Sequence, residues 1–270
     1  MTIKEKIQAL TTKTRYDFED LVMLVEVLRS EQGCPWDREQ NHHSIRKDLI
    51  EETYEVIEAI DTEDTTLLRE ELGDLLLQVV FHAEIEREQT MFDVHDVAND
   101  ICVKLIHRHP HVFGEVQADT SAQVLANWEV IKSEEKERIT VTDKLRAIPP
   151  MLPALMRAQK VGKKASCFDF SNAEEVILKI EEELDELRLA IRNNDTENVK
   201  EELGDLLLGV TSLARHLHVD AEESLVRATD KFIDRFDAVE QIVLLDKKTM
   251  QELSTDELNR IWEQNKHKKT

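Results

Sequence analysis

The stretch DLIEETYEVIEAIDTEDTTLLREELGDLLLQV, residues 48–79, decides the fold, because its pattern returns later in the chain. Residues 179–210 read KIEEELDELRLAIRNNDTENVKEELGDLLLGV and match it at an offset of 131 positions. A repeat of this length indicates that a whole structural unit was duplicated. Four acids keep one register in the two copies: Glu52, Glu55, Glu71 and Asp74 correspond to Glu183, Glu186, Glu202 and Asp205.

The chain is predicted to be all-α. Apolar residues recur with the spacing of one helix face, and only six Gly and five Pro interrupt 270 residues. In the first half we expect helices at residues 16–31, 44–60, 67–88, 94–107 and 122–138. In the second half we expect them at residues 154–164, 173–192, 197–216, 221–245 and 255–266.

The pair Pro149-Pro150 marks the boundary between the halves. Residues 140–153 are expected to connect an N-terminal helical domain, residues 1–139, to a C-terminal helical domain, residues 154–270. Within each repeat the short polar connections, residues 62–66 and 193–198, are expected to fold the two helices into an antiparallel hairpin. In the second connection, Asn194 and Glu197 have the spacing of a capping box.

The four acids of each copy are expected to converge inside their hairpin. At 100° per residue Glu52 lies in the apolar sector of its helix and Glu55 at the edge of that sector. On the next helix Glu71 and Asp74 line up beside the run 75–81, whose nearly continuous apolar character predicts a buried central helix. Uncompensated carboxylates in such an interior are unfavourable unless basic partners, protonation or a cation offset their charge.

An all-oxygen ligand set indicates a hard cation. Mg²⁺, with Mn²⁺ as a possible substitute, fits carboxylates without His or Cys better than zinc or copper does. A di-iron bundle would use Glu-x-x-His pairs, whereas here the third residue after each second-helix Glu is Asp. His82 and His216 lie two to three turns further along the chain, so iron is disfavoured.

Composition limits the partners and the compartment. A formal charge of −22 makes nucleic acid an unsuitable partner, since a phosphate backbone requires a basic surface. No apolar run is long enough for a membrane span, and the N-terminus lacks the apolar core of a signal peptide. Three cysteines without a CxxC pair indicate neither a disulfide framework nor a zinc site. These features predict a cytoplasmic protein that does not bind membranes.

The duplication extends to two further motifs in each half. A KxxxR motif occurs at Lys104 to Arg108 and at Lys231 to Arg235, and a WExxK motif occurs at Trp128 to Lys132 and at Trp262 to Lys266. In both halves the KxxxR motif follows the acids and the WExxK motif follows the KxxxR motif.

These motifs together resemble the MazG family of nucleoside triphosphate pyrophosphohydrolases in its two-domain form. The resemblance rests on the EExxE and ExxD acids, the ELGDLL core, CPWDREQ at residues 34–40 and HPHVF at residues 109–113. The acids alone would place the chain only in the all-α NTP pyrophosphatase superfamily. The other motifs and the tandem arrangement specify the narrower family, and the match spans nearly the whole chain.

The resemblance implies Mg²⁺-dependent hydrolysis of NTPs and dNTPs between the α and β phosphates, in the service of nucleotide-pool housecleaning or regulation, by a homodimer. It implies that both acid quartets are metal ligands, with the second quartet, Glu183, Glu186, Glu202 and Asp205, the more important for catalysis. Either Glu182 or Glu183 would then orient or deprotonate the attacking water.

Substrate contacts are hypotheses from residue type and spacing, and surface cations, packing tryptophans and a structural loop are the alternatives. The cations of the KxxxR motifs, Lys231 and Arg235 with Lys104 and Arg108, would meet phosphate oxygens. The WExxK motifs, Trp262 and Lys266 with Trp128 and Lys132, would stack on the base and contact the nucleotide. Trp36 and Asp37 would shape a base pocket in the first half, where Phe168 and Asp169 are only a rough counterpart in the second. His109 and His111 are expected to be turn residues.

Two other functions fit parts of the sequence. One is a narrower enzyme of the same chemistry, a dUTP or phosphoribosyl-ATP pyrophosphohydrolase. The other is a non-catalytic helical scaffold whose acid clusters hold structural cations. The repeated Lys-Arg and Trp-Lys pairs disfavour the scaffold, because a structural cation site has no need of them.

Overall fold

The described part of the chain consists of helices joined by turns and loops. The computed structural model describes residues 1–135 and 140–265, and within these ranges every regular element is helical, which confirms the all-α prediction. The chain divides into two compact units, Met1–Lys132 and Ser133–Thr270. Each unit contains one of the two predicted hairpins.

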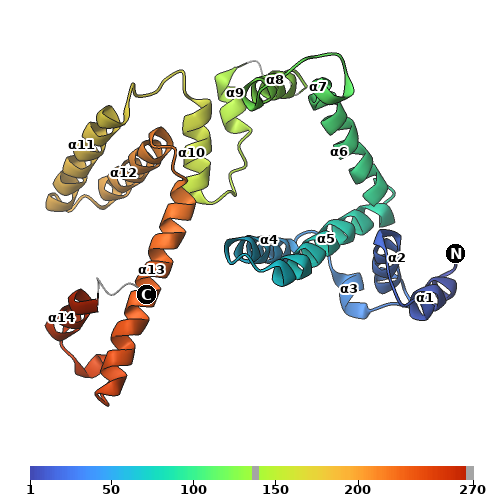
Figure 1. Ribbon diagram of the computed structural model, residues 1–270, viewed down its shortest axis with the longest axis horizontal. Helices are drawn as coiled ribbons and strands as arrows, with labels where there is room; N and C mark the ends of the chain where they lie inside the picture. Colours follow the sequence, from blue (N-terminus) through green and yellow to red (C-terminus); the bar gives the residue numbers. More distant parts are fainter. Residues whose placement is uncertain (136–139, 266–270) are drawn as a thin grey trace. The chain divides into compact units, whose positions relative to one another are not determined.

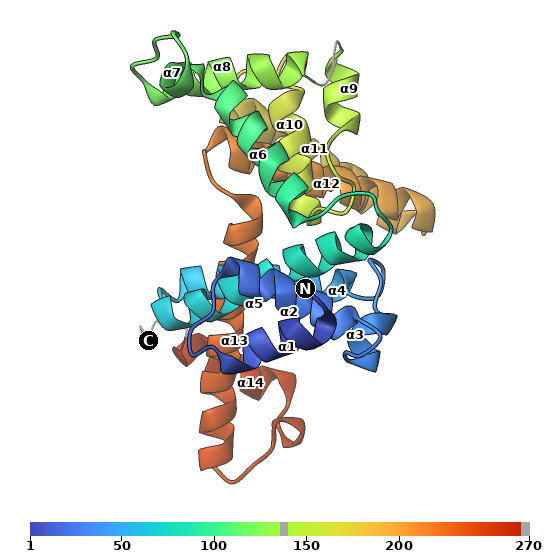
Figure 2. The same cartoon turned by 90° about the vertical axis from the view of Figure 1, so that its right-hand side faces the viewer.

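The first unit is built around the hairpin of α4 and α5, which lie side by side (Figure 1). Helix α2 packs on α5 and on α1 (Figure 2). The core of this unit, formed by residues of α2, α5, the start of α6 and the turn before α4, contains Val25, Ile45, Val80, Phe81, Ala83, Ile85 and Val94. The elements in order are α1 (Ile3–Thr12), α2 (Phe18–Arg29), α3 (Pro35–Glu39), α4 (Arg46–Asp61), α5 (Thr65–Glu88), α6 (Val94–Arg108), α7 (Pro110–Phe113) and α8 (Ser121–Glu134).

The second unit is built around the hairpin of α11 and α12, again two antiparallel helices (Figure 1). Helix α10 packs on α12 and on α13, and α14 packs on α13. Val176, Ala190, Thr211, Val239 and Val243 are buried here. The elements are α9 (Val141–Arg146), α10 (Ala154–Lys164), α11 (Ala173–Arg192), α12 (Thr196–His216), α13 (Ala221–Leu245), η1 (Met250–Glu252) and α14 (Thr255–Asn265).

All ten predicted helices are present, with ends that differ by a few residues where the ends are described. The predicted ends at Arg138 and Lys266 lie outside the described residues. Four short α-helices, α1, α3, α7 and α9, and the 3₁₀ helix η1 were not expected. The connector 140–153 is therefore not irregular throughout: Thr140 and Asp143 form a reciprocal capping box that starts α9.

The connection inside each hairpin follows one design, which corrects the predicted cap at Asn194. Asn194 has a φ of 53°, in the left-handed region, so it precedes the helix and does not cap it. Asp195 is the N-cap of α12, and its side chain accepts a hydrogen bond from the amide of Asn198. In the first hairpin Glu63 is the residue in the left-handed region, with a φ of 54°, and Asp64 is the N-cap of α5.

The prediction of a fully buried central helix is wrong for a single chain. Val80 and Phe81 of α5 are buried, but Leu76 and Val79 on the same helix are exposed. In α12 the side chains of Leu203, Leu207, Leu208 and Val210 are exposed by 44–50%. Each hairpin therefore packs one face inside its own unit and presents a second apolar face on the surface.

Candidate functional site

The α4–α5 hairpin brings three of the predicted acids together. Glu52 and Glu55 of α4 and Glu71 of α5 each offer a carboxylate oxygen, and these oxygens lie within 4.8 Å of one another. Glu71 is only 9% exposed. In the described part of the chain none of these three glutamates forms an ion pair with a basic side chain. We refer to Glu52, Glu55 and Glu71 as the first cluster.

Burial and mutual repulsion raise the pKa of two carboxyl groups in the first cluster. Burial, followed by the charges of Asp74 and Glu55, raises the pKa of Glu52 to about 7. Burial and the charge of Glu55 also raise the pKa of Glu71 above its usual range. A carboxylate that is costly to ionise among like charges is stabilised by a bound cation, so the donor set fits a divalent metal ion.

The α11–α12 hairpin forms a second cluster, Glu183, Glu186 and Glu202, with the same 4.8 Å limit. Burial and the charge of Glu186 raise the pKa of Glu202. This cluster has a basic neighbour that we did not predict. The ammonium of Lys179 lies 2.9 Å from Glu183 Oε1 and 3.0 Å from Glu182 Oε1. Lysine four residues before glutamate on a helix is a recognisable signal for such a pair.

The remaining predicted ligands and the candidate base lie beside the clusters. Asp74 and Asp205 are not part of the two close groups of oxygens, but their charges act on Glu52 and Glu202 respectively. The Glu182 side chain is 58% exposed and is held by Lys179. Each predicted quartet is thus three glutamates in proximity with an aspartate near them.

The CPWDREQ segment of the first unit is anchored by Arg29, a residue that sequence reasoning missed. The Arg29 guanidinium donates hydrogen bonds to the carbonyl oxygens of Asp37 (2.7 Å) and Gln40 (3.1 Å). It also forms a bidentate ion pair with Glu88 at the end of α5. Trp36 stands on this anchored segment with its side chain on the surface.

The loop before α11 is anchored differently. The Asp169 carboxylate accepts two hydrogen bonds from Arg215, at 2.6 and 2.7 Å, and a contact from His216 at 3.2 Å. These bonds, with Arg215 the main cause, lower the pKa of Asp169 to about 2. Phe168 beside it is 95% exposed. In this unit Asp169 is a structural anchor, and His216 belongs to that anchor.

The KxxxR and WExxK motifs meet within each half. In the first, the Arg108 guanidinium lies 5.5 Å from the ring centre of Trp128, which also contacts His109 edge-on. Arg108 is 6% exposed. In the second, the ring centres of Trp262 in α14 and Phe232 in α13 are 5.3 Å apart. Phe232 belongs to the KxxxR motif, since it directly follows Lys231. Lys104 and Lys231 are exposed, Lys132 pairs with Glu129 at 3.5 Å, and Lys266 lies outside the described residues.

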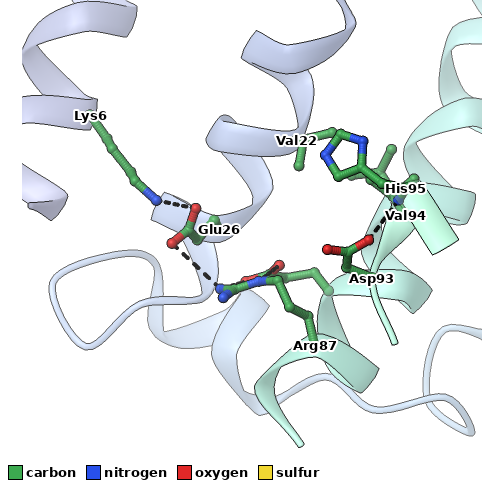
Figure 3. A pocket seen from close by; sticks show the side chains of 9 residues that line it. Lys6, Val22, Glu26, Arg87, Asp93, Val94 and His95 are labelled. Atoms are coloured by element: carbon green, nitrogen blue, oxygen red, sulfur yellow. Dashed lines mark hydrogen bonds and ion pairs between the residues drawn. The ribbon is translucent and has the colours of Figure 1, made fainter. Parts of the chain in front are cut away.

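A pocket of about 280 Å³ lies elsewhere in the first unit. Figure 3 shows its charged wall, where Glu26 binds both Lys6 and Arg87. Arg87 also pairs with Glu84 at 2.6 Å. None of the predicted site residues lines this pocket, and its basic side chains, Lys6 and Arg87, are both paired with acids. The ion pairs of Glu26 with Lys6 and Arg87 connect α1, α2 and α5.

Known proteins resemble this chain over almost its whole length. The family model of the MazG nucleotide pyrophosphohydrolase domain matches it twice, at residues 40–113 and 171–239. The nucleoside triphosphate pyrophosphohydrolase/pyrophosphatase MazG of Thermotoga maritima is 45% identical, with 92% of this chain and 95% of that protein covered. The nucleoside triphosphate pyrophosphohydrolase of Escherichia coli K12 is 43% identical, with 90% and 95% covered.

The Bacillus subtilis uncharacterized protein YabN is also similar, at 37% identity over 93% of this chain and 52% of its own length.

The fold and the site define the class of this protein: it is all-α, with two copies of a helical hairpin that brings three glutamates together. The chain belongs to the MazG family, and both matched segments contain one complete acid quartet. The predicted family and the prediction of an enzyme are confirmed. Within the described residues, no helix has the length and apolarity to cross a bilayer.

Proposed function

We propose that this chain hydrolyses nucleoside and deoxynucleoside triphosphates between the α and β phosphates, yielding a nucleoside monophosphate and pyrophosphate, and that it requires Mg²⁺. The observation that carries the proposal is the pair of in-register glutamate clusters, each with three carboxylate oxygens within 4.8 Å. Two relatives, both named as nucleoside triphosphate pyrophosphohydrolases, support the substrate class. The acids support the metal, because hard divalent cations bind oxygen ligands.

Each quartet would hold the cation through its carboxylates, with Glu52, Glu55, Glu71 and Asp74 in the first and Glu183, Glu186, Glu202 and Asp205 in the second. A bound Mg²⁺, or Mn²⁺ in its place, supplies charge neutralisation for the triphosphate and makes a bound water more acidic. Glu183 or its neighbour Glu182 orients the attacking water and accepts its proton. We assign the main catalytic role to the second quartet.

The chain's cations and aromatic residues bind the nucleotide. Lys231 and Arg235 bind phosphate oxygens; none of the described ion pairs engages either side chain, which leaves both available for an anion. Trp262 stacks on the base and Lys266 assists. In the first half Lys104, Trp36 and Asp37 have the corresponding tasks. Arg108, Trp128 and Lys132 pack together or pair internally, so their substrate roles are weaker there.

Residues 1–139 and 154–270 serve as two MazG-like domains, joined by residues 140–153. The exposed apolar faces of the two hairpins, including Leu76 and Leu207, are covered by a second copy of the chain. A homodimer would thereby complete the helical bundles that one chain leaves open. Its compartment would be the cytoplasm.

The test is product identification with a panel of NTPs and dNTPs and Mg²⁺. The proposal predicts NMP plus pyrophosphate from several nucleotides, and no reaction in EDTA. Turnover of dUTP alone, or of phosphoribosyl-ATP alone, would replace it with the narrower enzyme. A protein that Mg²⁺ stabilises against heat but that converts no nucleotide would be a scaffold. Release of NDP plus phosphate would contradict the assigned bond.

A further inference from the structure

The two glutamate clusters differ in the charges beside them, and one difference is a basic side chain. In the second, the Lys179 ammonium pairs with Glu183, whose side chain is 9% exposed. The position that matches Lys179 in the first copy is Asp48. The second cluster therefore includes a basic partner, while among the described residues no ion pair joins Glu52, Glu55 or Glu71 to a basic side chain.

The pair of Lys179 and Glu183 is more than an ordinary surface ion pair. Both residues lie on α11, one turn apart, and Glu183 offers one of the three converging oxygens. Solvent screens an interaction with a nearly buried carboxylate less than it screens a fully exposed pair. The Lys179 side chain is itself 38% exposed, so it can swing into solvent without disturbing the packing of the hairpin.

We propose, on the basis of the function proposed above, that Lys179 is an internal counter-ion that weakens divalent-cation binding at the second cluster, so that the first cluster fills at lower cation concentration. Two effects act together. A metal ion at Glu183 must displace the ammonium from the carboxylate, and any ammonium that stays nearby repels the ion. The first cluster lacks both obstacles.

The experiment measures Mn²⁺ binding by calorimetry at pH 8, without nucleotide, in proteins that keep one cluster each. The full-length chain with Glu202→Gln keeps the first cluster, and the chain with Glu71→Gln keeps the second. We expect the first-cluster protein to bind Mn²⁺ about tenfold more tightly. Circular dichroism checks that each variant is folded.

Reciprocal changes assign the difference to the lysine. In the second-cluster protein Lys179→Met keeps the aliphatic stem and removes the charge, and it should tighten Mn²⁺ binding about tenfold. The matched control is Lys200→Met on α12, which removes an exposed lysine paired with Glu197 and should change nothing. In the first-cluster protein Asp48→Lys should weaken binding.

Equal affinity at the two clusters, or unchanged affinity after Lys179→Met, would overturn the inference and leave the proposed hydrolase untouched. Absence of Mn²⁺ binding in every folded variant would overturn it as well, and would remove the metal sites from the proposed function. The Asp48→Lys result decides the matter if Lys179→Met fails to fold.

Discussion

Arg29 and Glu88, 59 residues apart in sequence, are joined by two hydrogen bonds of 2.8 Å, from Nε to Oε1 and from Nη2 to Oε2. The Arg29 side chain is 4% exposed, so this ion pair is the internal link between the end of α2, the CPWDREQ segment and the end of α5.

Glu88→Ala leaves the buried Arg29 charge without its carboxylate. We expect a loss of about 2 kcal/mol in the free energy of unfolding, since an uncompensated buried charge is costly. Urea unfolding followed by circular dichroism measures it. Glu197→Ala, which breaks the exposed pair with Lys200, is the control and should have no measurable effect. Equal losses in the free energy of unfolding would show that the pair of Arg29 and Glu88 stabilises the fold no more than the exposed pair does.

The raised pKa of Glu52 predicts a pH effect on the metal-free protein. Its folded pKa, about 7, exceeds the ordinary value of 4.5, so between these values the folded state binds more protons than the unfolded state. Stability is therefore lost as the pH rises from 4.5 through 7. In EDTA, Glu52→Gln should raise the melting temperature at pH 8 by about 3 °C and change it little at pH 4.5. A gain of equal size at both pH values would contradict the assigned pKa.

Catalysis is predicted to depend on cluster membership rather than on local charge. Glu202→Gln should lower kcat for pyrophosphate release by about 100-fold, since even residues that only support a metal ligand contribute about 10- to 100-fold. The adjacent Glu201→Gln removes the same charge outside the cluster and should stay within about twofold of the unaltered chain. Glu71→Gln should have a smaller effect than Glu202→Gln. Loss of activity in Glu201→Gln as well would indicate that overall charge matters and not the cluster.

The exposed apolar face of α12 predicts an assembly. Leu207→Asp should convert a homodimer into a monomer of 31.3 kDa, because Leu207 is 49% exposed in one chain and a buried aspartate would disfavour the interface. Light scattering coupled to size exclusion measures the mass. The control is Leu245→Asp at the end of α13, which is 82% exposed. A monomeric unaltered chain would contradict the dimer.

Periodicity and the repeat were sufficient to predict the helical hairpins and the convergence of Glu52, Glu55 and Glu71. Short helices were missed because they depend on local caps, such as Thr140 with Asp143, rather than on an apolar stripe. Arg29 was missed because its partners lie far away in sequence. The pair of Lys179 and Glu183 was not predicted, although the spacing of four residues on one helix indicates such a pair. The exposure of Leu76 could not be predicted from the sequence of its helix. Helical periodicity identifies an apolar face, but it does not show whether the same chain or another chain packs against that face.

The most direct test of the central claim follows the reaction in the doubly altered chain, Glu71→Gln with Glu202→Gln, in the presence of Mg²⁺ and a nucleoside triphosphate. The unaltered chain should release NMP and pyrophosphate, while the folded double variant should release them at about 1% of that rate or less. A double variant that is folded and retains the unaltered rate would show that the two glutamate clusters are not the catalytic sites.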